Sequence, residues 1–228
     1  VRIIKEAAAA ADSDWVRFID RHGIDSPLVV AHIRHASRGV PCYANTHPFS
    51  RELGGRMHVF AHNGTLQQVQ EGRLPASGPR PLGATDSEFA FCLLLARLAP
   101  VWRVDAPSVE ARTAVVVAFA RDMARLGPAN FLYSDGELLF AHADVRMQDT
   151  GRVEAPGLYI HGIAAMPADA VSQASGVDLG EGHGTLTAFA SVPLTPAGWQ
   201  PLARGEVVVV RDGSVVIRDL SSVVDSDG

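Results

Sequence analysis

The stretch "MHVFAHNGTL", residues 57–66, limits the fold of this chain more than any other part of the sequence. Apolar and polar residues alternate through its first half, a pattern typical of a half-buried β-strand. Asn63 and Gly64 follow where that strand is expected to end. A side-chain amide and a backbone N–H that no Cβ shields would then lie next to each other. Taken alone, a hairpin turn explains the Asn-Gly pair equally well.

The segments on either side of this strand differ in character. Upstream, "LVVAHIR" at residues 28–34 carries a β-branched run, which predicts a second, buried strand. Residues 35–55 between the two are rich in Gly, Pro and polar side chains and are expected to form a loop. Downstream, residues 67–83 contain repeated Gly and Pro and predict another loop.

Three segments have the apolar periodicity and the caps of helices. In "TDSEFAFCLLLARL", Thr85 and Glu88 have the spacing of a capping box immediately before an apolar run. Residues 108–126 predict a second long helix that ends before Gly-Pro, and residues 13–22 predict a short one. The side chains expected to face a core are Phe89, Cys92, Leu93 and Ala96, then Val115, Val116, Phe119 and Met123, then Trp15, Phe18 and Ile19.

The second half of the chain reads mainly as strands. Residues 130–142 and 206–219 are each two apolar runs joined by Asp-Gly, the signal of a tight β-hairpin. "LYIHG" and "TLTAFASV" are two further candidate strands. No repeat or linker composition divides the chain, so we expect residues 1–228 to form a single domain. The element order predicts an α+β sandwich in which helices cover stacked antiparallel sheets.

Composition restricts the classes of function. An apolar content of 47% supports a sizeable core, and a net charge of −5 without basic clusters argues against a nucleic-acid partner. No apolar run has the roughly 18–20 residues of a membrane span, and the first residues lack a signal-peptide pattern. The two cysteines, Cys42 and Cys92, do not suggest a disulfide framework. We therefore expect a cytoplasmic protein without a membrane or nucleic-acid partner.

Four short motifs carry candidate chemistry: "HIRHAS", "NTHPF", "AHNG" and "TDSE". Each one has an ordinary explanation, respectively a solvated charge, an Asx turn before a proline, a hairpin turn and a helix cap. Their order and spacing together are far more specific than any one of them.

In this order the motifs resemble the class II glutamine amidotransferases, which belong to the N-terminal nucleophile hydrolases. The resemblance is densest over residues 28–98. The later "FLYSDGELLFAHAD" and "ASVPLTPAGWQPLARGEVVVV" look like the family's small stand-alone branch, which includes the γ-glutamyl hydrolase of ergothioneine synthesis. The resemblance implies a four-layer α/β/β/α sandwich that hydrolyses the side-chain amide of glutamine or of a γ-glutamyl compound and releases ammonia.

The resemblance also implies roles for particular residues. The side-chain amide of Asn63 and the backbone N–H of Gly64 would form an oxyanion hole, since attack on an amide places negative charge on the former carbonyl oxygen. Arg34 would bind the α-carboxylate, a task suited to a planar, bidentate guanidinium. Asp86 would bind the α-amino group, and its place in a first helical turn favours the ionised carboxylate.

Three further residues complete the implied substrate site. Ser37 stands where the family more often has Thr, and the shared hydroxyl suggests a similar loop geometry. His47 in "NTHPF" and His62 in "AHNG" are expected to shape the loops around the substrate.

The nucleophile of the family is an N-terminal Cys whose own α-amine acts as the base, and Val1 cannot perform this chemistry. We therefore expect an upstream segment that carries the nucleophile to be missing from this numbering. Cys92 reads as a core residue on a helix, while Cys42 lies in a loop. A Cys42–His47 dyad is an open alternative.

Five histidines raise the competing idea of a metal site: His32, His35, His47, His58 and His62. No H-E-x-x-H pattern or cysteine pair supports zinc, so we expect neither a metal nor a cofactor. Two other functions stay open at this stage, a non-catalytic protein that binds a glutamine-like ligand or acts as a scaffold, and a His-based metallohydrolase. No fused acceptor domain is visible, so a separate ammonia-accepting enzyme is an expected partner. Self-association into a homo-oligomer is also left open.

Overall fold

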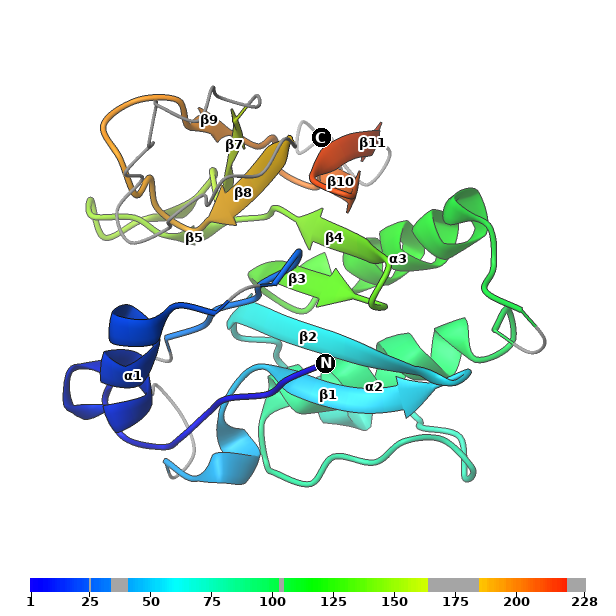
Figure 1. The fold of residues 1–228 in the computed structure, drawn as a ribbon. Helices are drawn as coiled ribbons and strands as arrows, with labels where there is room; N and C mark the ends of the chain where they lie inside the picture. Colours follow the sequence, from blue (N-terminus) through cyan, green and yellow to red (C-terminus); the bar gives the residue numbers. More distant parts are fainter. Residues whose placement is uncertain (25, 34–40, 103–104, 164–184, 221–228) are drawn as a thin grey trace.

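The computed structural model describes residues 1–24, 26–33, 41–102, 105–163 and 185–220. Its centre is a six-stranded antiparallel sheet with the strand order β1-β2-β3-β4-β10-β11 (Figure 1). The strands are β1 (Phe49–Leu53), β2 (Arg56–Gly64), β3 (Ala129–Ser134), β4 (Leu138–His142), β10 (Val207–Arg211) and β11 (Ser214–Asp219).

A smaller sheet packs on one face of the six-stranded sheet. It has the order β8-β7-β9, formed by β8 (Leu186–Ala190), β7 (Tyr159–Ile163) and β9 (Gln200–Pro201). Its Ile160, together with Leu158 and Leu202, joins a buried apolar cluster with side chains of β4 and β10 such as Leu139 and Val208. The short hairpin of β5 (Arg146–Met147) and β6 (Val153–Glu154) lies beside it.

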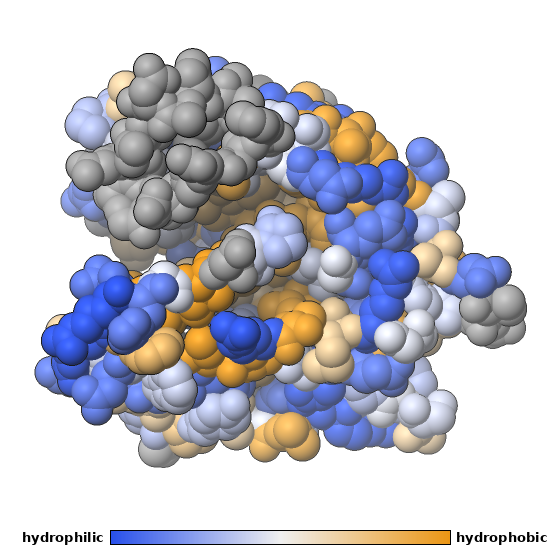
Figure 2. All heavy atoms as spheres, in the orientation of Figure 1, coloured by the Kyte–Doolittle hydropathy of each residue, from blue (hydrophilic) through white to orange (hydrophobic). Residues whose placement is uncertain are grey.

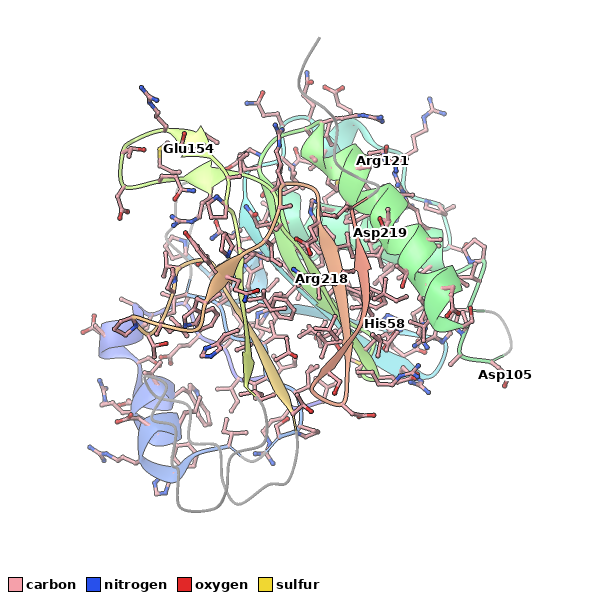
Figure 3. All side chains as sticks on the ribbon, turned by 90° about the horizontal axis from the view of Figure 1, so that it is seen from above. His58, Asp105, Arg121, Glu154, Arg218 and Asp219 are labelled. Carbon is pink, nitrogen blue, oxygen red and sulfur yellow. The ribbon has the colours of Figure 1, made fainter. Side chains whose placement is uncertain are left out.

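Two helices cover the opposite face of the large sheet. Helix α2 (Asp86–Leu98) contacts β1 and β2, and α3 (Val109–Ala124) contacts β3. The main core lies between them and the sheet, where Phe60 stacks on Phe91 and meets Phe119 edge-on. Figure 3 shows Asp105, just before α3, at the opposite end of the molecule from Glu154 of β6.

This architecture confirms the predicted fold class, α+β with stacked antiparallel sheets covered by helices. The described residues supply three of the four expected layers, in the order helices, large sheet, small sheet. No helix within these residues spans enough apolar sequence to cross a membrane.

The pairing directions divide the large sheet into two ends. The turns of the β1–β2, β3–β4 and β10–β11 hairpins all lie at one end, which we call the hairpin end. Both predicted Asp-Gly hairpins are confirmed, and Asp212 and Gly213 have the positive φ values of 48° and 75° that a primed turn requires. The other end, where β2 finishes and β3 begins, is called the open end below. It lies on the left in Figure 1.

Two predictions for the first third of the chain are wrong, one of a strand and one of a loop. Residues 28–33 form no strand, and Val29 and Ile33 are 65% and 80% exposed. A run of β-branched residues forms a strand only where it can pair with a neighbouring strand, and local sequence does not decide that pairing. Strand β1 lies inside the segment expected to be a loop. Its signal was the Gly54-Gly55 turn after Phe49–Leu53, and both glycines have positive φ.

The three predicted helices are present, but the predicted faces need correction. Helix α2 buries Phe91, Leu94, Leu95 and Leu98, whereas Phe89 and Leu93 are only partly buried. Because α2 carries apolar residues on most sides, periodicity alone could not select the face. In α3 the buried residues include Val116, Phe119 and Met123, as expected.

Helix α1 (Asp14–His22) buries none of its residues, and the rings of Trp15 and Phe18 are half-exposed and meet edge-on. Figure 2 shows further hydrophobic residues in the middle of the same face, where the N-terminal segment crosses β1 in Figure 1. There the Lys5 ammonium lies over the Tyr43 and Phe49 rings.

Candidate functional site

The candidate site lies at the open end of the large sheet. Pairing of β1 with β2 stops at Phe49 and Phe60, so residues 61–64 extend beyond β1 and keep β3 as their neighbour. Asn63 pairs with Asn130, and Gly64 pairs with Ala129. Both Asn63 and Gly64 are exposed. The strand therefore delivers these two residues to solvent on a rigid, paired backbone.

The Gly64 position accepts only glycine without rearrangement. Its φ is 155°, and an added Cβ would lie 1.8 Å from the Pro128 carbonyl oxygen. The preceding Asn63 oxygen accepts a hydrogen bond from Asn130 Nδ2, at 3.2 Å, and so faces β3. Because the C=O and N–H of a trans peptide point in opposite directions, the Gly64 N–H points away from β3, past the end of β1.

The Asn63 side chain lies on the sheet face opposite to that of His62. Side chains alternate between faces along a strand, and His62 is turned toward α2, where it meets Ser87. Asn63 is therefore directed to the face that packs against the small sheet. An amide and a backbone N–H, both hydrogen-bond donors, thus lie one residue apart at an exposed strand end.

Asp86 is the first residue of α2 and is joined to the same strand end. Its Oδ2 accepts the Leu66 N–H at 2.7 Å, and its Oδ1 accepts the Ser87 N–H at 2.9 Å. These bonds fix the carboxylate but leave acceptor capacity on it, since a carboxylate has about four lone-pair sites. The positive end of the α2 dipole favours its negative charge.

His62 links β2, α2 and the start of β3. Its Nε2 lies 3.1 Å from the Pro128 oxygen and its Nδ1 lies 2.9 Å from Ser87 Oγ. A carbonyl can only accept, so Nε2 carries the proton and Nδ1 accepts from the Ser87 hydroxyl. Burial lowers the pKa of His62, while the nearby Asp86 carboxylate opposes that shift. The ring is therefore a neutral spacer between the strand and Asp86.

The loop before α2 is held by Glu88 and Asn45. One Glu88 oxygen accepts the Gly83 N–H at 2.7 Å, and the other pairs with Arg51 of β1. Asn45 Oδ1 accepts the Ala84 N–H at 2.8 Å. Only half of the predicted capping box forms: Thr85 caps the Glu88 N–H, but the Glu88 carboxylate is used on the loop. These contacts fix where α2, and hence Asp86, begins.

His47 lies just before β1, at the open end. Its buried ring stacks on His32, with centroids 4.1 Å apart, and meets the Phe49 ring edge-on at 4.5 Å. Cys42 is half-buried in the same loop, where its carbonyl accepts the Thr46 hydroxyl. The Cys42–His47 dyad stays a prediction.

Cys92 of α2 is buried, as expected. Burial raises the pKa of its thiol to about 11, so almost no thiolate forms near neutral pH.

Two residues of the sequence-based substrate site, Arg34 and Ser37, fall outside the described ranges. His35, one of the five histidines considered for a metal site, also falls outside them. The α-carboxylate contact expected of Arg34 and the loop geometry expected of Ser37 therefore stay predictions.

The described residues contain no group of three or more His, Cys, Asp or Glu that could hold a metal ion. Among them, His58 lies toward the hairpin end, where its Nδ1 is 2.7 Å from the Tyr133 hydroxyl and its Nε2 is 3.0 Å from the Leu53 oxygen. Both nitrogens are therefore occupied, as are both nitrogens of His62.

Sequence reading missed three residues that hold the open end together. Ser87 lies inside "TDSE" but was read only as part of a helix cap. Asn130 was read only as the first residue of a strand, and Asp144 only as the end of the family-like stretch "FLYSDGELLFAHAD". For Asn130, the available signal was a polar residue in an otherwise apolar strand, because buried polar groups need hydrogen-bond partners.

Comparison with known proteins identifies the family of the chain. The family model described as "Glutamine amidotransferases class-II" matches residues 1–227. The Escherichia coli (strain K12) protein YafJ, provisionally named a glutamine amidotransferase, is 32% identical over 206 residues, which cover 90% of this chain and 78% of YafJ. The chain belongs to the class II glutamine amidotransferase family.

Solved structures support the fold. A protein described as a predicted glutamine amidotransferase from Pseudomonas aeruginosa has a TM-score of 0.57 at 31% identity, with 77% of this chain and 66% of that one covered. A class-II domain protein from Silicibacter pomeroyi has a TM-score of 0.58 at 19% identity, covering 95% and 83%. The second likeness concerns the fold alone.

The chain spans only part of some relatives. An uncharacterized protein of Methanocaldococcus jannaschii is 32% identical over 95% of this chain, but the match covers 59% of that protein.

Proposed function

We propose that this chain is a glutamine-hydrolysing domain, which cleaves the side-chain amide of glutamine or of a γ-glutamyl compound and releases ammonia. One observation carries the proposal: the exposed end of β2 presents Asn63 and Gly64 beside the fixed carboxylate of Asp86. Membership of the class II glutamine amidotransferase family supports this reaction class.

The two donors suit the charge that develops during amide cleavage. Attack on the amide carbon moves negative charge onto the carbonyl oxygen, and donors already aimed at that position stabilise it without reorganisation. The Asn63 amide and the Gly64 N–H are such donors on a backbone held by β3. Removing one donor of this kind typically costs about 3–4 kcal/mol of transition-state stabilisation.

Asp86 is suited to the other end of the substrate. Its carboxylate, oriented by the Leu66 and Ser87 N–H groups, would accept hydrogen bonds from the α-ammonium of glutamine. Arg34 would neutralise the α-carboxylate, which completes recognition of the zwitterion. His62 and Ser87 would keep Asp86 at a constant position relative to the oxyanion donors.

The nucleophile is the part of the proposal that residues 1–228 do not supply. The mechanism requires a cysteine with a free α-amine as base, at the mature N-terminus of the full-length protein. Cys92, with its raised pKa, is unsuited to the role. Ammonia would pass to a separate accepting enzyme or be released into solution. In the first case the domain would act as the partner of a synthase, and in the second as a simple hydrolase. We place this activity in the cytoplasm as part of the same proposal.

The test is ammonia release from glutamine by the full-length protein with its native N-terminus. Asn63→Ala should lower kcat about 100- to 1,000-fold with little change in KM, because the lost donor acts in the transition state. Asp86→Ala should raise KM at least tenfold, because it removes a charged ground-state contact. Gln67→Ala, an exposed neighbour, is the matched control.

The outcomes separate the competing functions. A loss below tenfold in both variants would show that the site is wrongly assigned. If the unmodified protein binds glutamine but releases no ammonia, the non-catalytic binding function is correct instead. Activity that disappears with a chelator and returns with a metal ion would support the metallohydrolase.

A further inference from the structure

Asn130, the second residue of β3, has no place in the site predicted from sequence, yet it lies directly opposite Asn63. We propose that Asn130 is the positioning residue of the oxyanion hole: its side-chain amide fixes the Asn63–Gly64 peptide and so aims the Gly64 N–H. The inference rests on the proposed function, because it assigns a purpose to a contact with one of the proposed donors.

The contact is made to the peptide that carries the donor. Asn130 Nδ2 donates to the Asn63 carbonyl oxygen at 3.2 Å. That carbonyl and the Gly64 N–H belong to the same planar unit, so holding the oxygen also holds the direction of the N–H. A hydrogen bond accepted by the carbonyl further polarises the unit and strengthens its N–H as a donor.

The Asn130 amide is itself immobilised. Its Nδ2 also donates to the Val145 oxygen at 2.8 Å, and its Oδ1 accepts the Asp144 N–H at 2.7 Å. Both amide hydrogens and one acceptor site are thus used, in a side chain that is 1% exposed. A buried amide with three partners cannot rotate without leaving polar groups unsatisfied.

Neighbouring residues close the remaining space around this amide. A Cβ added to Gly157 would lie 1.7 Å from Asn130 Oδ1, so the glycine backbone packs directly against it. Asp144 is anchored in turn, because its carboxylate accepts the Ala129 N–H at 3.1 Å and pairs with Arg204 Nε at 3.0 Å. The Asn63 carbonyl is therefore held from a rigid base rather than by a loose side chain.

A purely structural role would predict a different result from a positioning role. Loss of a buried hydrogen bond that only stabilises β3 would lower the unfolding temperature and leave turnover per folded molecule unchanged. Misdirection of an oxyanion donor should instead lower kcat and spare KM, because that donor acts in the transition state.

The experiment compares two ways of disturbing Asn130 with one matched control, all in the full-length protein. Asn130→Ala removes the amide, and Gly157→Ala displaces it by the added Cβ. Tyr133→Phe removes a buried hydrogen bond from the same strand, that to His58, far from the site. The readouts are kcat and KM for glutamine hydrolysis, the unfolding temperature, and the NMR order parameter of the Gly64 amide.

We expect both disturbing variants to lower kcat at least tenfold with KM within about threefold, since small misplacements of catalytic groups have effects of this size. The Gly64 order parameter should fall from about 0.85 toward 0.6, the range of flexible backbone. Tyr133→Phe should leave both kcat and the Gly64 order parameter unchanged.

Unchanged kcat and an unchanged Gly64 order parameter in a folded variant would overturn the inference. Failure of both variants to fold would also reject it, by making Asn130 a residue of structural stability alone. If the unmodified protein hydrolyses no glutamine, the proposed function fails instead, and the Gly64 order parameter still reports whether Asn130 fixes this peptide.

Discussion

The two ends of the large sheet are closed by different means. At the hairpin end, Glu137 lies between three hairpins and α3, and its carboxylate pairs with Arg56, Arg112 and Arg211 at 2.7–3.3 Å. Arg112 also pairs with the fully buried Asp135 at 2.8 Å. Charged side chains there satisfy one another and close the end of the sheet.

At the open end, side chains bind the backbone instead. Each of four buried residues holds a backbone group of Asn63 or of residues 128–129. They are His62, Asn130, His142 and Asp144. Because these bonds fix the strand from its inner side, Asn63 and Gly64 can be exposed without becoming loose. One sheet thus has an end built for stability and an end that leaves donors available.

The largest expected effect comes from Gly64→Ala at the open end. The added Cβ would meet the Pro128 oxygen at 1.8 Å, so the backbone must move. We expect kcat to fall more than 100-fold and the free energy of unfolding to fall by about 2–4 kcal/mol. Steady-state kinetics measures kcat, and denaturant unfolding measures the free energy of unfolding.

Gly55→Ala at the hairpin end is the control, because Gly55 has φ of 78° but open space around it. It should cost about 1–2 kcal/mol of stability and leave kcat unchanged. Equal losses of activity in both variants would contradict the distinction between the ends.

Arg112→Ala should have the opposite profile. It leaves the buried Asp135 carboxylate without its partner, which typically costs about 3–5 kcal/mol of unfolding free energy. We expect kcat and KM per folded molecule to be unaffected at low temperature. Arg125→Ala, which breaks an exposed pair with Asp122, should cost at most about 1 kcal/mol. A change in KM for Arg112→Ala would show that the two ends are coupled.

Acid should weaken the open end over a defined pH range. Burial lowers the pKa of His142 from 6.5 to about 4. Between these two pH values His142 binds a proton in the unfolded chain but not in the folded chain. The contribution of His142 to the free energy of unfolding is therefore fully present above about pH 6.5 and is lost as the pH falls to about 4. At 1.36 kcal/mol per pKa unit, the loss is about 3 kcal/mol.

Urea unfolding between pH 7.5 and 4 should show this loss. In His142→Gln, the slope of the free energy of unfolding against pH should be smaller. The variant removes only the His142 share, since burial also lowers the pKa of His62 and of His58. At the hairpin end, the Arg112 hydrogen bond lowers the pKa of Glu137. The stabilisation that the Glu137 carboxylate contributes is therefore lost at a lower pH than that of His142. An unchanged slope in His142→Gln would contradict the assignment.

Among the changes at the open end, Ser87→Ala has the smallest expected effect. The variant removes the hydroxyl between His62 and Asp86 but leaves both N–H groups on the Asp86 carboxylate. We expect a loss of about 1–2 kcal/mol in stability and a rise in KM of less than tenfold. Ser108→Ala, which removes the cap of α3, should cost about 1 kcal/mol without any change in KM.

Local signals predicted the elements that are specified locally. The Asp-Gly turns, the Thr85 cap of α2 and the alternation in β2 were readable because each depends on neighbouring residues alone. The strand expected at residues 28–34 failed, and β1 was missed, because pairing with a distant strand decides both. The candidate site followed from motif order, but its supporting residues did not.

The sequence by itself determined the family, the α+β class and the candidate residues of the proposed site, Asn63, Gly64 and Asp86. Tertiary structure decided what surrounds them. Asn130 is 67 residues from Asn63 in the chain, and only the pairing of β2 with β3 makes its amide a support for the Asn63 carbonyl. The physical reason is that a buried hydrogen bond depends on which strands meet, which no local pattern encodes.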